Sequence, residues 1–159
     1  MWGHDVVYAT DLPDYADNEV RSAQWLARVV EEHCTARWRR AHATFLSLAG
    51  QLIVATKTHR LPDDLSDAAR CAAQLFLDAD LAILAADEAR LLWYDEGIAR
   101  EWRQHPDAPS NAFRNGRRQA LEQLLAHEPL FLSTGFAPLA APARANLHLL
   151  IHPVFVTAQ

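Results

Sequence analysis

The sequence is poor in the residues that mark several classes of protein. Its 159 residues include only 2 cysteines and 5 glycines, and Lys and Arg total 15 against 20 for Asp and Glu. Cys34 and Cys71 lie far apart, without the CxxC or CxxH spacing of a structural zinc site. With no secretory signal pattern, we expect a cytoplasmic protein in which both thiols are small core residues.

Long apolar runs and strand-like alternation are also missing. Hydrophobic residues make up 50% of the chain, yet no run approaches the roughly 18 residues that a membrane helix needs. The net charge of -5 supplies no broad basic surface. We therefore expect neither a nucleic-acid polymer nor a membrane as partner.

Apolar residues instead recur at helical spacing, between helix caps and prolines. Asp17 and Ser66 stand at two of the predicted helix starts, and Pro106 and Pro129 follow two of the predicted ends. The predicted helices cover about residues 17–33, 35–59, 67–86, 91–102, 113–125 and 138–151. About six helices without a linker predict a single all-α domain over residues 1–159, with the tail from about 152 left open.

The stretch "WGHDVVY", residues 2–8, places His4 and Asp5 side by side in an apolar run. Adjacent helical positions lie about 100° apart, so the pair can face one centre only near a helix end or with particular rotamers. By itself the dipeptide is a weak signal for a metal site, and a core histidine beside a turn aspartate is the simpler explanation.

The stretch "FLDADLAIL", residues 76–84, places two carboxylates inside an apolar helix. Asp78 and Asp80 lie about 200° apart around that helix, so they cannot face the same point. Asp80 shares its face with bulky apolar residues, and we expect it to be the more deeply placed of the two. A buried carboxylate must be paired, protonated or bound to a metal.

Two further sets of polar residues have two explanations each. In "DNEVRSA", Glu19 and Ser22 are a functional acid and its support, or part of a helix start that favours capping and acidic groups. Lys57, Arg117 and Arg144 bind phosphate oxygens, which a guanidinium matches in bidentate fashion, or belong to solvated helix faces.

Six motifs together resemble a known family in order and spacing. They are "WGHDVVY", "DNEVRSA", "ATKTH", "FLDADLAIL", "FRNGRRQAL" and "ARANL". Over about residues 2–150 the chain resembles the predicted metal-dependent phosphohydrolases of the HD-domain superfamily. The resemblance implies an HD-like helical bundle with His4, Asp5 and Asp80 as metal ligands and Asp78 in a supporting position.

The resemblance also implies a reaction, the hydrolysis of a phosphate ester or a nucleotide. His59 and Glu19 are its candidate catalytic residues, and Lys57, Arg117 and Arg144 are its candidate substrate ligands. A set of imidazole nitrogens and carboxylate oxygens suits Mn²⁺, Fe²⁺, Co²⁺, Ni²⁺ or, less well, Mg²⁺. Such an ion lowers the pKa of a bound water and polarises a phosphoryl oxygen.

One departure from the family affects these expectations. The family's first metal-binding histidine lies on a helix before the HD pair, whereas this sequence starts at Met1. We therefore expect an N-terminally shortened member with a weak or empty metal site, in which His59 is the best internal substitute. The alternative is an inactive paralogue or helical interaction protein whose uncovered apolar groove binds a partner helix or a second copy of the chain, as in a homodimer.

Overall fold

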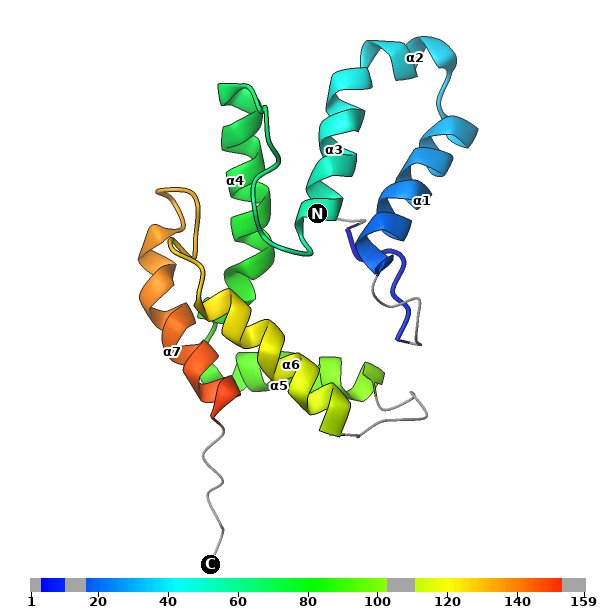
Figure 1. Cartoon of the computed structure of the whole chain (residues 1–159). Helices are drawn as coiled ribbons and strands as arrows, with labels where there is room; N and C mark the ends of the chain where they lie inside the picture. The colour runs from blue at the N-terminus through cyan, green and yellow to red at the C-terminus, as the bar shows by residue number, and fades with distance from the viewer. Residues whose placement is uncertain (1–3, 11–16, 103–110, 153–159) are drawn as a thin grey trace, which may run out of the picture. The chain divides into compact units, whose positions relative to one another are not determined.

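The computed structural model describes residues 4–10, 17–102 and 111–152. Within these ranges the chain forms helices only, which confirms the predicted all-α class, and no helix has the length and apolar character to span a membrane. The helices in chain order (Figure 1) are α1 Asn18–His33, α2 Ala36–Ala41, α3 Ala43–Ala55, α4 Asp67–Leu81, η2 Ala82–Ala85, α5 Glu88–Trp102, α6 Asn111–Leu125, η3 Ala137–Leu139 and α7 Ala140–Ile151, where η marks a 3-10 helix.

The chain divides into two compact units, Met1–Asp80 and Leu81–Gln159. The first unit holds α1, α2, α3 and all but the last residue of α4, and the second holds the helices from η2 onward. The single domain expected over residues 1–159 stays a prediction.

The second predicted helix is interrupted at His42, which separates α2 from α3. The His42 N–H is shared between the carbonyls of Trp38 and Arg39, at 3.1 and 3.3 Å. The His42 ring also stacks on Trp38, with 4.1 Å between centroids, and its Nδ1 lies 2.9 Å from the Trp38 carbonyl oxygen. These side-chain contacts compete with the regular helical hydrogen bonds. No glycine or proline in the sequence marks the position of the break.

The helix α3 ends at Ala55, and a turn continues to His59, where the sequence predicts the helix to end. The Thr56 hydroxyl donates to the Ile53 carbonyl at 2.7 Å, and the His59 N–H donates to the Ala55 carbonyl at 2.8 Å. His59 has a φ of 51°, the left-handed conformation that commonly closes a helix. The turn therefore gives His59 a fixed backbone position directly after α3.

The C-terminal unit has its own apolar core. Its buried members are Leu81, Leu84, Leu91, Leu121, Leu130, Phe131, Ala143, Leu147 and Ile151. The third predicted helix becomes the 3-10 helix η2 after Leu81. There the Asn146 amide donates to the carbonyls of Leu84 and Ala86, at 2.7 and 2.8 Å. These carbonyls at the end of η2 are therefore hydrogen-bonded without continuing the α-helix.

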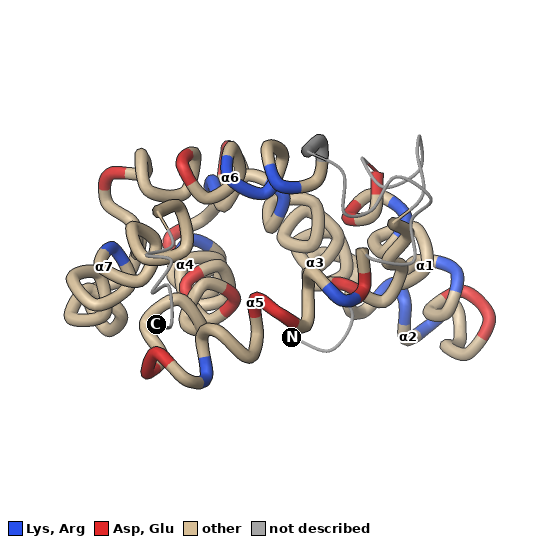
Figure 2. Tube along the Cα trace, turned by 90° about the horizontal axis from the view of Figure 1, so that it is seen from below, with Lys and Arg blue, Asp and Glu red and all other residues tan. Residues whose placement is uncertain are grey.

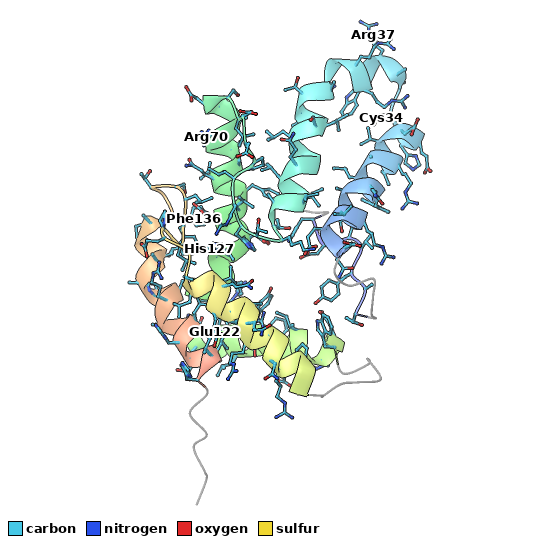
Figure 3. The ribbon with its side chains drawn as sticks, in the orientation of Figure 1. Cys34, Arg37, Arg70, Glu122, His127 and Phe136 are labelled. Atoms are coloured by element: carbon cyan, nitrogen blue, oxygen red, sulfur yellow. The ribbon has the colours of Figure 1, made fainter. Side chains whose placement is uncertain are left out.

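The two cysteines are free thiols, and one of them contradicts the expected core position. Cys34, labelled in Figure 3, is partly buried after α1, whereas Cys71 is exposed on α4. Cys71 lies about 200° around the helix from the buried Ala73, so it faces solvent. The tail beyond residue 152 lies outside the described residues.

Candidate metal centre

Four of the predicted site residues meet in the N-terminal unit, and we call them the His-Asp cluster. The Nε2 atom of His4 lies 2.8 Å from Asp5 Oδ2 and 2.9 Å from Asp80 Oδ1. The Nε2 atom of His59 lies 3.0 Å from Asp80 Oδ2. Segments far apart in the sequence thus converge: the stretch before α1, the turn after α3 and the last turn of α4.

Asp80 is the centre of this cluster because each of its oxygens faces a different imidazole. The side chains of His4, His59 and Asp80 are 15%, 14% and 19% exposed, so water competes weakly with these contacts. Phe76 lies one turn before Asp80 on α4, and its ring meets the His4 ring edge to face, with 6.2 Å between centroids. One face of α4 therefore orients His4 through both a carboxylate and an aromatic ring.

Asp5 is the exposed member of the cluster, with 65% of its side chain accessible. Burial of its inner side raises the pKa of the Asp5 carboxyl above its ordinary value, and the neighbouring His4 opposes that rise. The Asp80 carboxylate raises the pKa of Asp5 further, while His59 lowers it. Because most of the side chain contacts water, solvent screening keeps these charge effects small.

The left-handed backbone at His59 supports a prediction about stability. Replacing His59 with glycine or with alanine removes the same imidazole, but only alanine keeps a Cβ that opposes the positive φ of 51°. We expect His59→Gly to be more stable than His59→Ala by about 0.5–1 kcal/mol, measured by urea denaturation. At Thr58, whose φ is not positive, we expect the reverse order; the same order at both positions would contradict strain at His59.

The carboxylates of α4 are buried in the order opposite to the one expected. Asp78 is 1% exposed, whereas the side chain of Asp80 is 19% exposed. The prediction that Asp80 lies deeper is wrong, because the face that Asp80 shares with Phe76 is lined by the polar cluster rather than by close apolar packing. Asp78 adjoins the core residue Leu77, and its support of the cluster stays a prediction.

Residues of the "DNEVRSA" motif contact the HD segment, but not in the way predicted. Asn18 and Ser22, both buried on α1, hydrogen-bond to the backbone of Ala9 and Val7. Sequence reasoning considered Asn18 only as part of a helix start and missed this role. The available signal was the pair of groups, an amide and a hydroxyl four residues apart, that can each donate and accept at once.

Asp17 and Glu19 lie at the N-cap and in the first turn of α1, where the helix-start explanation of this motif expects them. Asp17 occupies the N-cap position of α1 without a side-chain capping bond. Glu19 is partly buried in the first turn, and its Oε2 has no hydrogen-bond partner among the described residues. A catalytic role for Glu19 stays a prediction.

The candidate phosphate ligands belong to different units. Lys57 is exposed in the turn that ends at His59. Basic residues lie along α6 (Figure 2). One of them, Arg117, donates through its guanidinium to Asp95 Oδ1, from Nε at 3.1 Å and from Nη2 at 2.7 Å. Only Lys57 lies in the same unit as the His-Asp cluster.

Arg144 is engaged by the chain segment that follows α6. Its guanidinium donates to the carbonyls of Leu125 and His127, at 2.8 and 2.6 Å, and to the Glu128 carboxylate at 2.8 Å (Figure 3 labels His127). These bonds use two of its nitrogens, so the structure gives Arg144 a role in holding the fold of the C-terminal unit.

The chemistry of the His-Asp cluster fits a divalent cation, although its atoms bond to one another here. In the described part of the chain, no group of three or more His, Cys, Asp or Glu side chains already surrounds a common point as metal ligands. Adjacent ligands at about 2.1 Å from an octahedral ion lie roughly 3 Å apart. The nitrogen-oxygen separations of 2.8–3.0 Å match that spacing.

The position of His4 Nε2 supports this fit. A neutral imidazole nitrogen has either one hydrogen or one lone pair, yet two carboxylate oxygens lie within 2.9 Å of it. One hydrogen cannot point straight at both oxygens. A cation between the nitrogen and the two oxygens would satisfy all three atoms and reduce the repulsion between Asp5 and Asp80.

Comparison of the chain with protein-family models, curated proteins and solved structures finds no match.

Proposed function

We propose that the chain is a metal-dependent phosphohydrolase whose cation is held by His4, Asp5 and Asp80, with His59 as a further nitrogen ligand. The observation that carries the proposal is the bridging of two imidazoles by the Asp80 carboxylate, at 2.9 and 3.0 Å. The order of the six motifs, which resembles that of HD-superfamily phosphohydrolases, supports an HD-like arrangement of the helices.

The cation and the residues of the His-Asp cluster would have different roles in phosphate hydrolysis. A divalent cation would lower the pKa of a water and polarise a phosphoryl oxygen. Asp80 orients both imidazoles, and the exposed Asp5 sits on the solvent side, where a substrate enters. Lys57 lies in the turn that ends at His59, so its ammonium group can neutralise charge on a bound phosphate. The substrate class is a small phosphate ester or a nucleotide.

Metal dependence is the direct test of this proposal. The purified chain is freed of metal with a chelator, titrated with Mn²⁺ by electron paramagnetic resonance, and then assayed for phosphate release from p-nitrophenyl phosphate and a nucleotide panel. We expect saturable binding of about one ion per chain and phosphate release that appears with Mn²⁺ and disappears with EDTA. The same titration with His33→Ala, an exposed histidine outside the cluster, controls for nonspecific binding.

Two results would overturn the proposal in different ways. Binding of Mn²⁺ without release of phosphate from any tested substrate would contradict the proposed hydrolase activity and favour the inactive paralogue. The absence of saturable binding would remove the metal site as well, and the interaction-protein alternative would then explain the chain better.

A further inference from the structure

Two side chains of α1 form a paired set of hydrogen bonds with the segment that follows the HD pair. The Ala9 N–H donates to Asn18 Oδ1 at 2.8 Å, and Asn18 Nδ2 donates to the Ala9 carbonyl at 2.9 Å. The Val7 N–H donates to Ser22 Oγ at 3.1 Å, and the Ser22 hydroxyl donates to the Val7 carbonyl at 3.3 Å. Asn18 is 9% exposed and Ser22 is fully buried.

The two side chains are spaced along α1 in nearly the way that hydrogen-bonding residues are spaced along a β-strand. Four residues of an α-helix rise about 6 Å, and two residues of an extended chain advance about 6.6 Å. The rise between Asn18 and Ser22 is thus close to the advance of two extended residues, and their partners Val7 and Ala9 lie two residues apart. Each side chain exchanges both bonds with one backbone residue, as a residue of a neighbouring antiparallel strand does in a hydrogen-bonded pair.

Such pairing fixes the register of the segment as well as its position. In an extended chain, a slip by one residue turns every backbone N–H, carbonyl and side chain to the opposite side. A slipped segment would leave Asn18 and Ser22, both buried, without their partners, which is costly. His4 and Asp5 form a turn that leads through a bend into Val7, and Asp5 lies only two residues before Val7. The position at which Val7 is held therefore limits where this turn presents Asp5 and His4.

We infer that Asn18 and Ser22 are positioning residues of the His-Asp cluster, which hold His4 and Asp5 in register with Asp80 and His59. In its catalytic consequence this inference rests on the proposed metal-dependent function. Its structural consequence, the placement of His4 against Asp80, can be measured in the metal-free chain, so the two proposals can fail separately.

The test compares four variants with the wild-type chain. Asn18→Ala and Ser22→Ala remove the side-chain partners, and Ser22→Thr keeps a hydroxyl that can restore the bonds. Asn146→Ala is the matched control, because Asn146 also holds two backbone carbonyls by its amide but lies in the C-terminal unit. Circular dichroism verifies that each variant is folded before it is used.

Nuclear magnetic resonance of the metal-free chain gives the first result. In Asn18→Ala and Ser22→Ala we expect hydrogen exchange of the Val7 and Ala9 amides to accelerate by about tenfold or more and the His4 ring resonances to shift. We expect both signals to stay near wild type in Ser22→Thr and Asn146→Ala. Unchanged His4 resonances in Asn18→Ala and Ser22→Ala, despite faster exchange at Val7 and Ala9, would overturn the inference.

Titration with Mn²⁺ alone gives the second result. We expect about tenfold weaker binding in Asn18→Ala and Ser22→Ala, recovery in Ser22→Thr, and no change in Asn146→Ala. If the wild-type chain binds no Mn²⁺, the proposed function fails, and the His4 resonances still decide the positioning role. Equal weakening in Asn146→Ala would show a general loss of stability and would contradict positioning.

Discussion

Replacing Asp80 with asparagine is expected to weaken Mn²⁺ binding by about a hundredfold or more and to abolish metal-dependent phosphate release. The substitution keeps the size of the side chain but removes its negative charge and one of its two acceptor oxygens. In the wild-type chain those oxygens face His4 and His59 at 2.9 and 3.0 Å, so an amide can serve only one imidazole as an acceptor. Loss of a residue that only hydrogen-bonds to a metal ligand lowers metal affinity about 10- to 100-fold. Loss of a direct ligand is expected to lower it further.

The control for Asp80→Asn is Asp67→Asn, on the same helix. Asp67 is exposed in the first turn of α4, far along the helix from the cluster. We expect its replacement to leave Mn²⁺ affinity and phosphate release unchanged. Isothermal titration of both variants, with urea denaturation to compare stability, checks the prediction. Wild-type Mn²⁺ affinity in a folded Asp80→Asn variant would show that Asp80 is not a metal ligand.

Replacing Arg144 with methionine is expected to destabilise the chain by about 2–3 kcal/mol in urea denaturation. The guanidinium of Arg144 is 28% exposed and donates to the carbonyls of Leu125 and His127 at 2.8 and 2.6 Å. Hydrogen bonds from a charged donor contribute about 1.5–3 kcal/mol, and the substitution removes that donor from two partly buried carbonyls. Lysine should rescue little of this loss, because one ammonium group cannot span both carbonyls in the way that a planar fork does.

The third partner of Arg144 provides the control. Glu128 is 85% exposed, so its ion pair with Arg144 is screened by water, and Glu128→Gln should change stability by less than about 0.5 kcal/mol. The alternative expectation, that Arg144 binds substrate phosphate, predicts another pattern. A variant of wild-type stability with a raised KM for the phosphate substrate would contradict the structural role and support that expectation.

The sequence predicts the helices well where local signals define their ends. The first helix begins after Asp17 and ends at His33 as expected, and α5 and α6 end at Trp102 and Leu125, near the predicted limits. Apolar spacing and prolines are properties of short segments, so they predict helix limits without knowledge of the fold. The break at His42 could not be predicted in the same way, because it depends on how one histidine ring packs on Trp38.

Four of the residues that the sequence indicates for the candidate site meet in the structure, but the residues that support them were not predictable. The HD pair, Asp80 and His59 were singled out from their residue types and from the resemblance, and the structure brings all four together. The relative burial of Asp78 and Asp80 was predicted in the wrong order. A helical wheel places side chains around an axis, but it does not show which neighbouring segment covers each side.

The sequence by itself determined the all-α class, most helix limits and the side chains that form the His-Asp cluster. Each of these follows from residue type and from spacing within about one helical turn or one helix. Only the tertiary structure decided that one carboxylate, Asp80, serves two histidines that are distant in sequence, and that Asn18 and Ser22 bind the backbone beside the HD pair. Those contacts join segments that lie apart in the sequence, and local propensity does not indicate which of these segments will meet.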